Sequence, residues 1–363
     1  MKIPTNNRKK PMFELLFYMY LVVVVVSLIL NYSRIEEKQR IITVPMEILL
    51  FITVYHVAKK KVTPSVLDAI IKAFVVLSIS SAIIAIYQMI GSPYFLKIAP
   101  ARGAFGGFYR STAIFHAEYE LGYILIFGMI ILLVRYKNKP FLYYSMPLLC
   151  IALITTFHRL VWIIFVVCLG SHLFLTKRIR TMFIFIFLFI LVYAFSSNLL
   201  SNIEKNEMAQ SFIERRLLYD TVTERFLQYN IAFQIISNHF WGLGGYDTKE
   251  YYEIIAEHSM IRTKGNPVVI HNGFLATGVK YGKISMLIFP AMMVSMLIYF
   301  IRKIEINNTI TLYPFYIVLI WMLSNLSNDL SNFNVYFVIL VALVSGSFVS
   351  LYNNQFMSNT KEV

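Results

Sequence analysis

The residues with the clearest chemical potential lie in segment 267–275, where His271 and Asn272 open an apolar stretch after a long polar loop. Three arginines from distant parts of the chain, Arg110, Arg159 and Arg225, are expected on the same side of the molecule. Guanidinium groups bind phosphate oxygens bidentately, and an imidazole can take up a proton near neutral pH. The sequence therefore predicts one site, assembled from separate segments, for an anionic substrate.

The elements that must position these residues are membrane-spanning helices. Of the 363 residues, 58% are hydrophobic and only 14% are charged, whereas soluble domains are about a quarter charged. Uncharged runs such as residues 21–30 and 182–195 do not alternate between apolar and polar side chains, as barrel strands would. The composition predicts an all-α polytopic membrane protein.

The apolar runs predict about ten spans, since a helix needs about 20 residues to cross the hydrocarbon core. The predicted spans cover residues 12–30, 41–58, 66–90, 113–134, 141–157, 160–176, 181–200, 271–301, 310–326 and 333–352. The fifth and sixth are short and separated only by His158 and Arg159, so a re-entrant pair stays open as an alternative. The first run has no cleavage window of small residues and is expected to remain as an anchor.

Basic clusters predict the orientation. Lysines and arginines flank the first, second, fourth, sixth and eighth spans, and with ten spans all these clusters fall on the side of the N-terminus. The positive-inside rule makes that side cytoplasmic, with both termini inside. The net charge of +14 is thus distributed among the spans, and no basic stripe indicates nucleic-acid binding.

The chain is expected to form one membrane domain, with N-terminal spans in residues 1–200 and C-terminal spans in residues 271–363. Between them, the only long loop (about 201–270) is expected outside, and a loop of this length is usually functional. Apolar residues at helical spacing over 214–236 predict an amphipathic helix suited to the membrane surface. Glycines at 242–245 predict a turn after it.

No metal or other cofactor is expected. The sequence has no Asp-x-Asp motif outside and no spacing of His, Cys and carboxylates that is typical of a metal site. Cys150 and Cys168 both fall in apolar spans, where they are expected to be core residues without a disulfide.

Several motifs in the second half of the chain resemble those of the O-antigen ligase/polymerase superfamily. They are an arginine-led amphipathic helix at Arg225, a Gly-x-Gly turn at 242–244, a His-Asn-x-x-Leu segment at 271–275 and a glycine at Gly282. Upstream, residues 155–159 resemble the family's Thr-x-Ser-Arg turn, and residues 110–122 resemble its Arg-x-Ser-Gly-x-Phe segment. The chain departs from the pattern at His158, in place of serine, and at 116–118, where the family often has Pro-Asn.

The resemblance implies a GT-C-like helical fold, with the loop periplasmic and partly helical. It also implies a glycosyltransferase that moves a glycan from undecaprenyl diphosphate to an acceptor at the outer face of the bacterial inner membrane. In this chemistry Arg159 and Arg225 would stabilise the leaving diphosphate, and His271 would act as the general base. Arg110 and Asn272 are expected to contact substrate.

Some readings stay open for individual residues. Glu118 and Glu120 could pair with Arg110 for structure or bind sugar hydroxyls, and we include both carboxylates among the candidate substrate-binding residues. Arg225 on an amphipathic helix could instead contact lipid headgroups.

The favoured hypothesis is a Wzy-type polysaccharide polymerase, which extends a lipid-linked glycan chain by transfer onto the next lipid-linked repeat unit. Its expected partners are undecaprenyl-diphosphate-linked glycans, membrane lipids, a flippase and a chain-length regulator. One alternative is an O-antigen ligase that transfers the glycan to lipid A core. The other is a flippase or transporter for lipid-linked sugars, which would place ionisable groups near the bilayer midplane.

Overall fold

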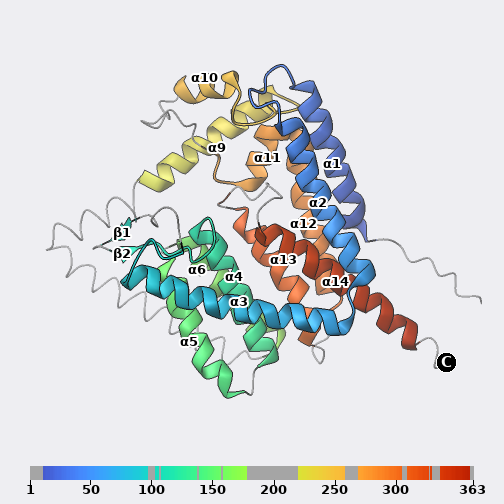
Figure 1. The fold of residues 1–363 in the computed structure, drawn as a ribbon. Helices are drawn as coiled ribbons and strands as arrows, with labels where there is room; N and C mark the ends of the chain where they lie inside the picture. Colours follow the sequence, from blue (N-terminus) through green and yellow to red (C-terminus); the bar gives the residue numbers. More distant parts are fainter. Residues whose placement is uncertain are drawn as a thin grey trace, which may run out of the picture.

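The computed structural model describes residues 11–96, 103–105, 108–136, 139–156, 158–177, 220–257, 269–304, 309–326, 328 and 336–359. These residues form a helical bundle, with one small antiparallel pair of strands, β1 (Gly103–Phe105) and β2 (Phe108–Tyr109) (Figure 1). Within the described residues, four helices are long and apolar enough to cross a membrane: α1 (Met12–Leu30), α2 (Arg40–Lys61), α3 (Pro64–Ile90) and α12 (Lys283–Ile301). The chain is therefore a polytopic helical membrane protein.

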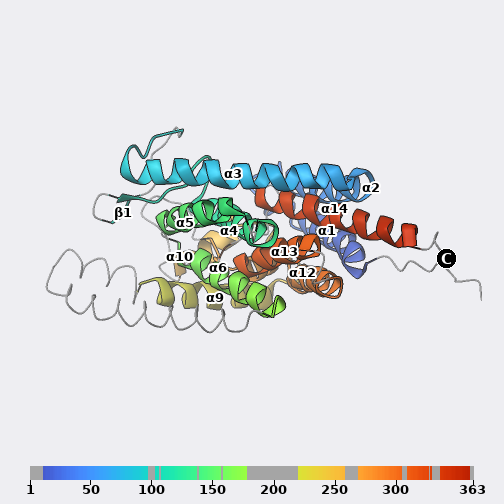
Figure 2. The same cartoon turned by 90° about the horizontal axis from the view of Figure 1, so that it is seen from below.

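Further apolar helices complete the bundle. They are α4 (Glu118–Arg135), α5 (Pro140–Thr155), α6 (Arg159–Leu175), α13 (Tyr313–Ser324) and α14 (Tyr336–Asn359). Helix α3 lies along one side of the bundle and packs on α4 and α5 (Figure 2). Helix α14 packs closely along α2, because Gly346 faces the Tyr55 carbonyl oxygen, which would lie 2.2 Å from an added Cβ.

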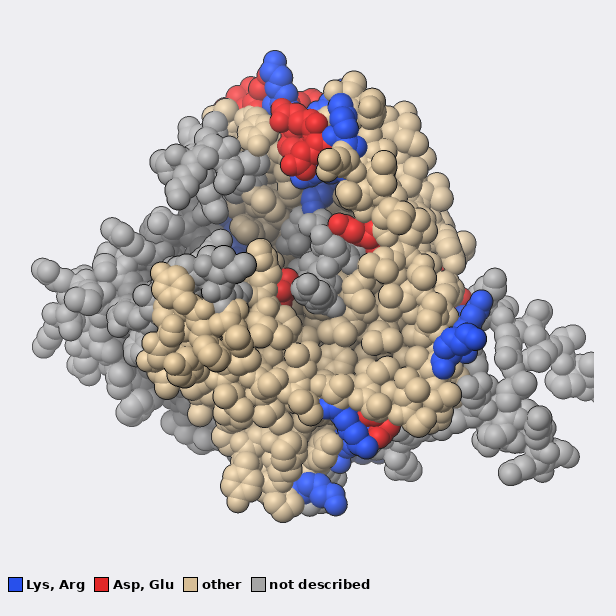
Figure 3. Space-filling view, in the orientation of Figure 1, with Lys and Arg blue, Asp and Glu red and all other residues tan. Residues whose placement is uncertain are grey.

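One end of the bundle is basic. Helix α2 ends at Lys59, Lys60 and Lys61. Helix α4 ends at Arg135, which pairs with Asp68, and Arg302 and Lys303 follow α12. Figure 3 shows charged side chains gathered around the α1–α2 loop and again along the lower right edge, with a broad, mostly uncharged surface between them. This distribution matches helices whose middle parts contact hydrocarbon.

The predicted spans agree with the described helices except at four places, one of which is the last span, where α14 continues to Asn359 and not only to 352. Span 271–301 is wrong as one helix, because Gly282, with φ 89°, separates α11 (Gly273–Tyr281) from α12. The fourth helix begins at Glu118 rather than 113, since Ala113 has φ 48° and turns precede the helix. A 3₁₀ turn, η2 (Thr309–Leu312), precedes α13. The predicted span 181–200 lies outside the described residues.

The predicted amphipathic helix is confirmed over its described part as α9 (Asp220–Asn238). One face of α9, with Ile231 and Ile235, is buried in a small second core that includes Val279 of α11. Phe226 and Phe233 remain exposed, one heptad apart. Contact of α9 with the membrane surface stays a prediction.

Candidate functional site

The candidate residues lie where three helices begin. Helix α4 starts at Glu118, α6 at Arg159, and α11 directly after His271 and Asn272. Glu118, Arg225 and His271 all interact electrostatically with His158, which immediately precedes α6. Free N–H groups and the positive ends of helix dipoles favour anions at such a place. In Figure 1, α4, α6, α9 and α11 lie around the middle of the view.

A buried amide that the sequence analysis did not single out positions Arg110. Gln88 of α3 accepts a hydrogen bond from the Ala113 N–H at 2.9 Å and donates one to the Ala113 carbonyl at 3.0 Å. The Ser111 N–H donates to the Thr155 carbonyl at 3.1 Å, which attaches the same segment to the end of α5. A lone glutamine in an apolar stretch was the available signal, because buried amides must find hydrogen-bond partners.

The two carboxylates of α4 have different partners. Arg110 Nη1 donates to Glu118 Oε1 at 3.1 Å in a half-buried ion pair. Glu120 Oε2 accepts from the backbone N–H of His116 at 3.2 Å, close to the start of α4, as an acidic residue in the first helical turn often does. The structure thus contains the structural pair that the sequence left open for Glu118. Contact of either carboxylate with substrate stays a prediction.

The turn between α5 and α6 presents Arg159 to solvent, whereas His158 is half-buried. Arg159 interacts electrostatically with Arg110 and Arg225, and among the described residues it forms no ion pair with a carboxylate. Burial lowers the pKa of His158 to about 4; the Glu118 charge opposes this shift, and the nearby cations reinforce it. The imidazole of His158 is therefore neutral at neutral pH.

Asn272 has a structural task at the start of α11. Its side-chain oxygen accepts hydrogen bonds from the N–H groups of Phe274 at 3.0 Å and Leu275 at 3.1 Å, which makes it the N-cap. Gly273 is required beside it, because an added Cβ would lie 1.9 Å from Asn325 Oδ1. The contact of Asn272 with a sugar stays a prediction.

His271 is attached to the helix that carries Arg225. The His271 backbone N–H donates to Oε1 of Gln228 at 3.1 Å, and Gln228 is buried on α9, about one turn after Arg225. The sequence did not single out Gln228, and its spacing from Arg225 was the available signal. This bond couples the position of the imidazole to that of the guanidinium.

The glycines of two separate motifs interlock. In the turn after α9, the N–H groups of Leu243 and Gly244 donate to the carbonyls of Val279 at 2.9 Å and Lys280 at 2.8 Å. Gly242 has φ 69°, and an added Cβ there would lie 2.6 Å from the backbone nitrogen of Gly282. We call this contact between the 242–244 turn and Gly282 the glycine junction. It joins α9 to the end of α11.

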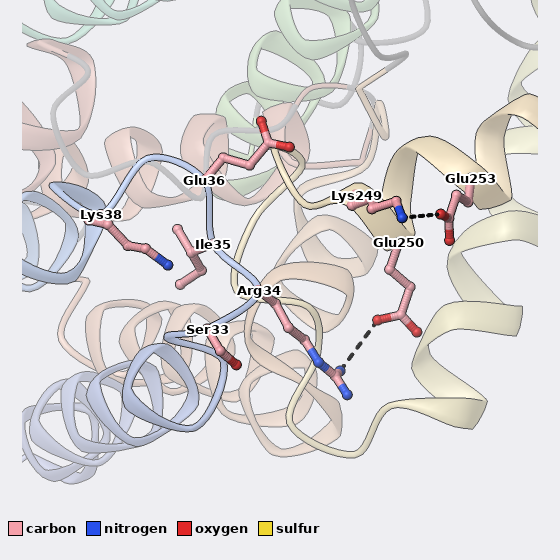
Figure 4. A pocket seen from close by; sticks show the side chains of 8 residues that line it. All are labelled: Ser33, Arg34, Ile35, Glu36, Lys38, Lys249, Glu250 and Glu253. Carbon is pink, nitrogen blue, oxygen red and sulfur yellow. Dashed lines mark ion pairs between the residues drawn. The ribbon is translucent and has the colours of Figure 1, made fainter.

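A separate surface groove of about 610 Å³ lies between the α1–α2 loop and α10 (Lys249–Glu257) (Figure 4). Its lining residues are Ser33, Arg34, Ile35, Glu36, Lys38, Lys249, Glu250 and Glu253. Charges within the lining pair with one another, at 3.4 Å for both Arg34–Glu250 and Lys249–Glu253. None of the candidate residues lines this groove, so we place the chemistry elsewhere.

The chemistry available to the described residues is that of guanidinium, carboxylate and imidazole groups. Cys150 and Cys168 are free thiols, and Cys168 is buried. In the part of the chain that the structure describes, no group of three or more His, Cys, Asp or Glu side chains could hold a metal ion.

Residues 144–290 match the model of a protein family described as O-antigen ligase. The matched segment includes Arg159, Arg225, His271 and the whole glycine junction, and excludes Arg110. The resemblance to the O-antigen ligase/polymerase superfamily is thereby confirmed, and ligase- or polymerase-type activity in general is supported. The transporter alternative gains no support from this match. None of the curated proteins compared with the chain matches it.

Proposed function

We propose that this protein is a polysaccharide polymerase of the bacterial inner membrane. It transfers an undecaprenyl-diphosphate-linked glycan chain onto a lipid-linked repeat unit at the periplasmic face. The observation that carries the proposal is the meeting of Arg110, Arg159, Arg225 and His271 where helices begin. The family match over residues 144–290 supports it.

The arginines act on the leaving group. As the bond between the anomeric carbon and the diphosphate oxygen breaks, its electron pair stays with the diphosphate and negative charge grows there. Arg159, which has no carboxylate partner among the described residues, and Arg225 offer positive charge to it. One preorganised donor of this kind contributes about 3–4 kcal/mol to transition-state stabilisation.

His271 acts on the acceptor. A neutral imidazole takes the proton of the acceptor hydroxyl while that oxygen forms a bond to the anomeric carbon, so that the proton ends on His271. His271 lies just before the first turn of α11, where free N–H groups and the helix dipole favour a bound anion beside the base.

The charges at the helix ends support the orientation in this proposal. The site lies at the starts of α4, α6 and α11, whereas α4 ends at Arg135 and α12 is followed by Arg302 and Lys303. The positive-inside rule places the basic end in the cytoplasm, and with it both termini. A flippase would then deliver substrate to the periplasmic side, where the site lies, and a chain-length regulator would also act on the periplasmic side.

A second candidate activity is transfer of the glycan to lipid A core, because the matched family is described as O-antigen ligase. Deletion of the gene distinguishes the two activities. Loss of a polymerase leaves single repeats on the acceptor, and loss of a ligase leaves no glycan attached. We expect single repeats, read from the ladder of surface polysaccharide on a gel, with long chains restored by the wild-type gene. An unchanged ladder after deletion would exclude both activities.

A further inference from the structure

The Arg110–Glu118 ion pair does not use all of the hydrogen-bonding groups beside it. Arg110 Nη1 bonds Glu118 at 3.1 Å, but the buried Nε of Arg110 has no hydrogen-bond partner among the residues that the structure describes. A buried donor left unpaired costs about 1–3 kcal/mol. Such a group in a native structure needs an explanation, and a bound ligand is one.

His158 lies against the same pair. Its ring packs at an angle on the ring of Tyr119, the neighbour of Glu118, with the ring centroids 6.1 Å apart. The Ser111–Thr155 backbone bond at 3.1 Å brings the residue after Arg110 to the turn that carries His158. The Nδ1 atom of His158 is also buried, and no described residue forms a hydrogen bond with it. Two neighbouring side chains thus each have a buried polar atom without a described hydrogen-bond partner, Arg110 Nε and His158 Nδ1.

Local structure does not explain the imidazole. His158 occupies the N-cap position of α6, where Ser, Thr, Asp or Asn is preferred, yet its side chain makes no capping bond. Burial lowers the pKa of His158 to about 4, so the ring is neutral at neutral pH and offers one donor and one acceptor. The stability that a capping residue would supply is absent here, so helix capping does not explain the histidine at this position.

The group formed by Arg110, Glu118 and His158 differs in net charge from the arginines around it. Arg110 is balanced by Glu118 and His158 is neutral, so the three side chains together carry no net charge. Arg159 has no such balance among the described residues. A sugar hydroxyl, which is uncharged and both donates and accepts hydrogen bonds, suits this neutral group of side chains. A diphosphate suits the positive charge around Arg159.

We propose that His158, Arg110 and Glu118 form a saccharide subsite, in which Arg110 Nε and the His158 ring bind hydroxyl groups of the sugar next to the diphosphate. This inference rests on the proposed function. The diphosphate interacts with Arg159 and Arg225, and the sugar ring lies toward α4. His158 is thereby a substrate-binding residue that helps select the sugar.

The test compares two substitutions of one side chain. His158→Phe keeps the ring shape and removes both polar atoms, whereas His158→Gln keeps one donor and one acceptor. The substrate is the lipid-linked repeat unit extracted from the deletion strain, and chain growth is measured in proteoliposomes against its concentration. We expect His158→Phe to raise KM about tenfold, as for one lost polar contact, and His158→Gln to stay within about threefold of the wild type.

His172 provides the matched control. It is a buried histidine of α6, packed beside Tyr316 and about 21 Å along the helix from His158. His172→Phe is expected to leave KM unchanged. The pH profile of kcat/KM between about pH 5.5 and 8 should keep its shape in His158→Phe, because a ring that is already neutral loses no ionisation there.

A wild-type KM in His158→Phe would overturn the subsite, as would equal damage by Phe and Gln at this position. If His158→Phe does not fold, His158→Leu replaces it in the same comparison. Failure of the wild-type protein to extend the extracted units is a different result, because it overturns the proposed function together with the subsite.

Discussion

Two polar regions of the molecule use their charges in opposite ways. Where the α1–α2 loop meets α2, Arg40 pairs with Glu37 at 3.0 Å and Asp247 at 2.9 Å, and within the loop Arg34 pairs with Glu250 at 3.4 Å. At the start of α6, Arg159 has no carboxylate partner among the described residues. The loop charges attach the α1–α2 connection to the segment after α9.

The difference teaches which charges are structural. A cation beside a carboxylate has its field cancelled, so it fixes geometry and offers little to a ligand. Cations that repel one another, as Arg159 and its neighbour Arg225 do, raise the energy of the free protein. A bound anion relieves that repulsion. The unbalanced region is thus suited to substrate and the balanced one to stability.

The largest effect is expected from the imidazole of the unbalanced region. His271→Ala should lower kcat about 10²–10⁴-fold, because the proton of the acceptor hydroxyl loses its base. Chain growth in proteoliposomes measures it. His239→Ala is the matched control, since His239 pairs with Glu250 in the balanced region at 3.0 Å, and it should keep most activity. Equal losses in both variants would contradict the assignment.

The glycine junction should be next in effect. Gly282→Ala places a Cβ 2.1 Å from the Phe240 carbonyl oxygen at φ 89°, so we expect the folded state to lose about 3 kcal/mol. Thermal unfolding in detergent measures the loss. Gly170→Ala on α6 is the control, because no described neighbour lies within 4 Å of the added Cβ, and it should not destabilise the protein. A wild-type melting temperature for Gly282→Ala would show that the junction is not rigid.

Arg159→Lys sharpens the comparison by keeping the charge. A lysine cannot bind a phosphate group with two parallel bonds, so kcat should fall about 10–100-fold. The same change at Arg34, which is balanced by Glu250, should leave the rate within about twofold of the wild type. Normal long-chain glycan from Arg159→Lys would argue that only the charge at this position matters.

The smallest effect is expected in the balanced region. Asp247→Asn removes the ion pair with Arg40 and weakens the bond from the Glu37 N–H, which is 3.0 Å long. The free energy of unfolding should fall by about 1 kcal/mol, since the pair is partly exposed. Lys249→Gln, which breaks an exposed pair with Glu253, should cost less. If Asp247→Asn lowered the rate of chain growth strongly and left the free energy of unfolding unchanged, the distinction between the two regions would be wrong.

The sequence predicted the helices well, since apolar runs report burial or lipid contact directly. It placed the ends of α1 as the structure has them, at Met12 and Leu30. It missed the break at Gly282, because a glycine inside an apolar run is compatible with a continuous helix. Only the opposing backbone at Phe240 makes that glycine a break, and this contact is tertiary.

The candidate site could be predicted in its charged residues but not in its supports. Arg159 and His271 stand out because charged and titratable groups are rare near apolar spans. Gln88 and Gln228 do not stand out, because their importance depends on which backbone groups they reach. The helix cap at Asn272 is a local feature. It could have been predicted from the sequence, because asparagine is a preferred residue directly before a helix.

The glycine junction holds α9 near its end, and Arg225 lies 13 positions before Asn238 on this helix, about 20 Å away. A tilt of about 5° at the junction therefore moves the guanidinium by about 2 Å, which is enough to weaken an oriented contact. The Gln228–His271 bond and the buried Ile231 and Ile235 hold the same helix closer to Arg225. The glycine junction therefore shares with these contacts the task of orienting the guanidinium.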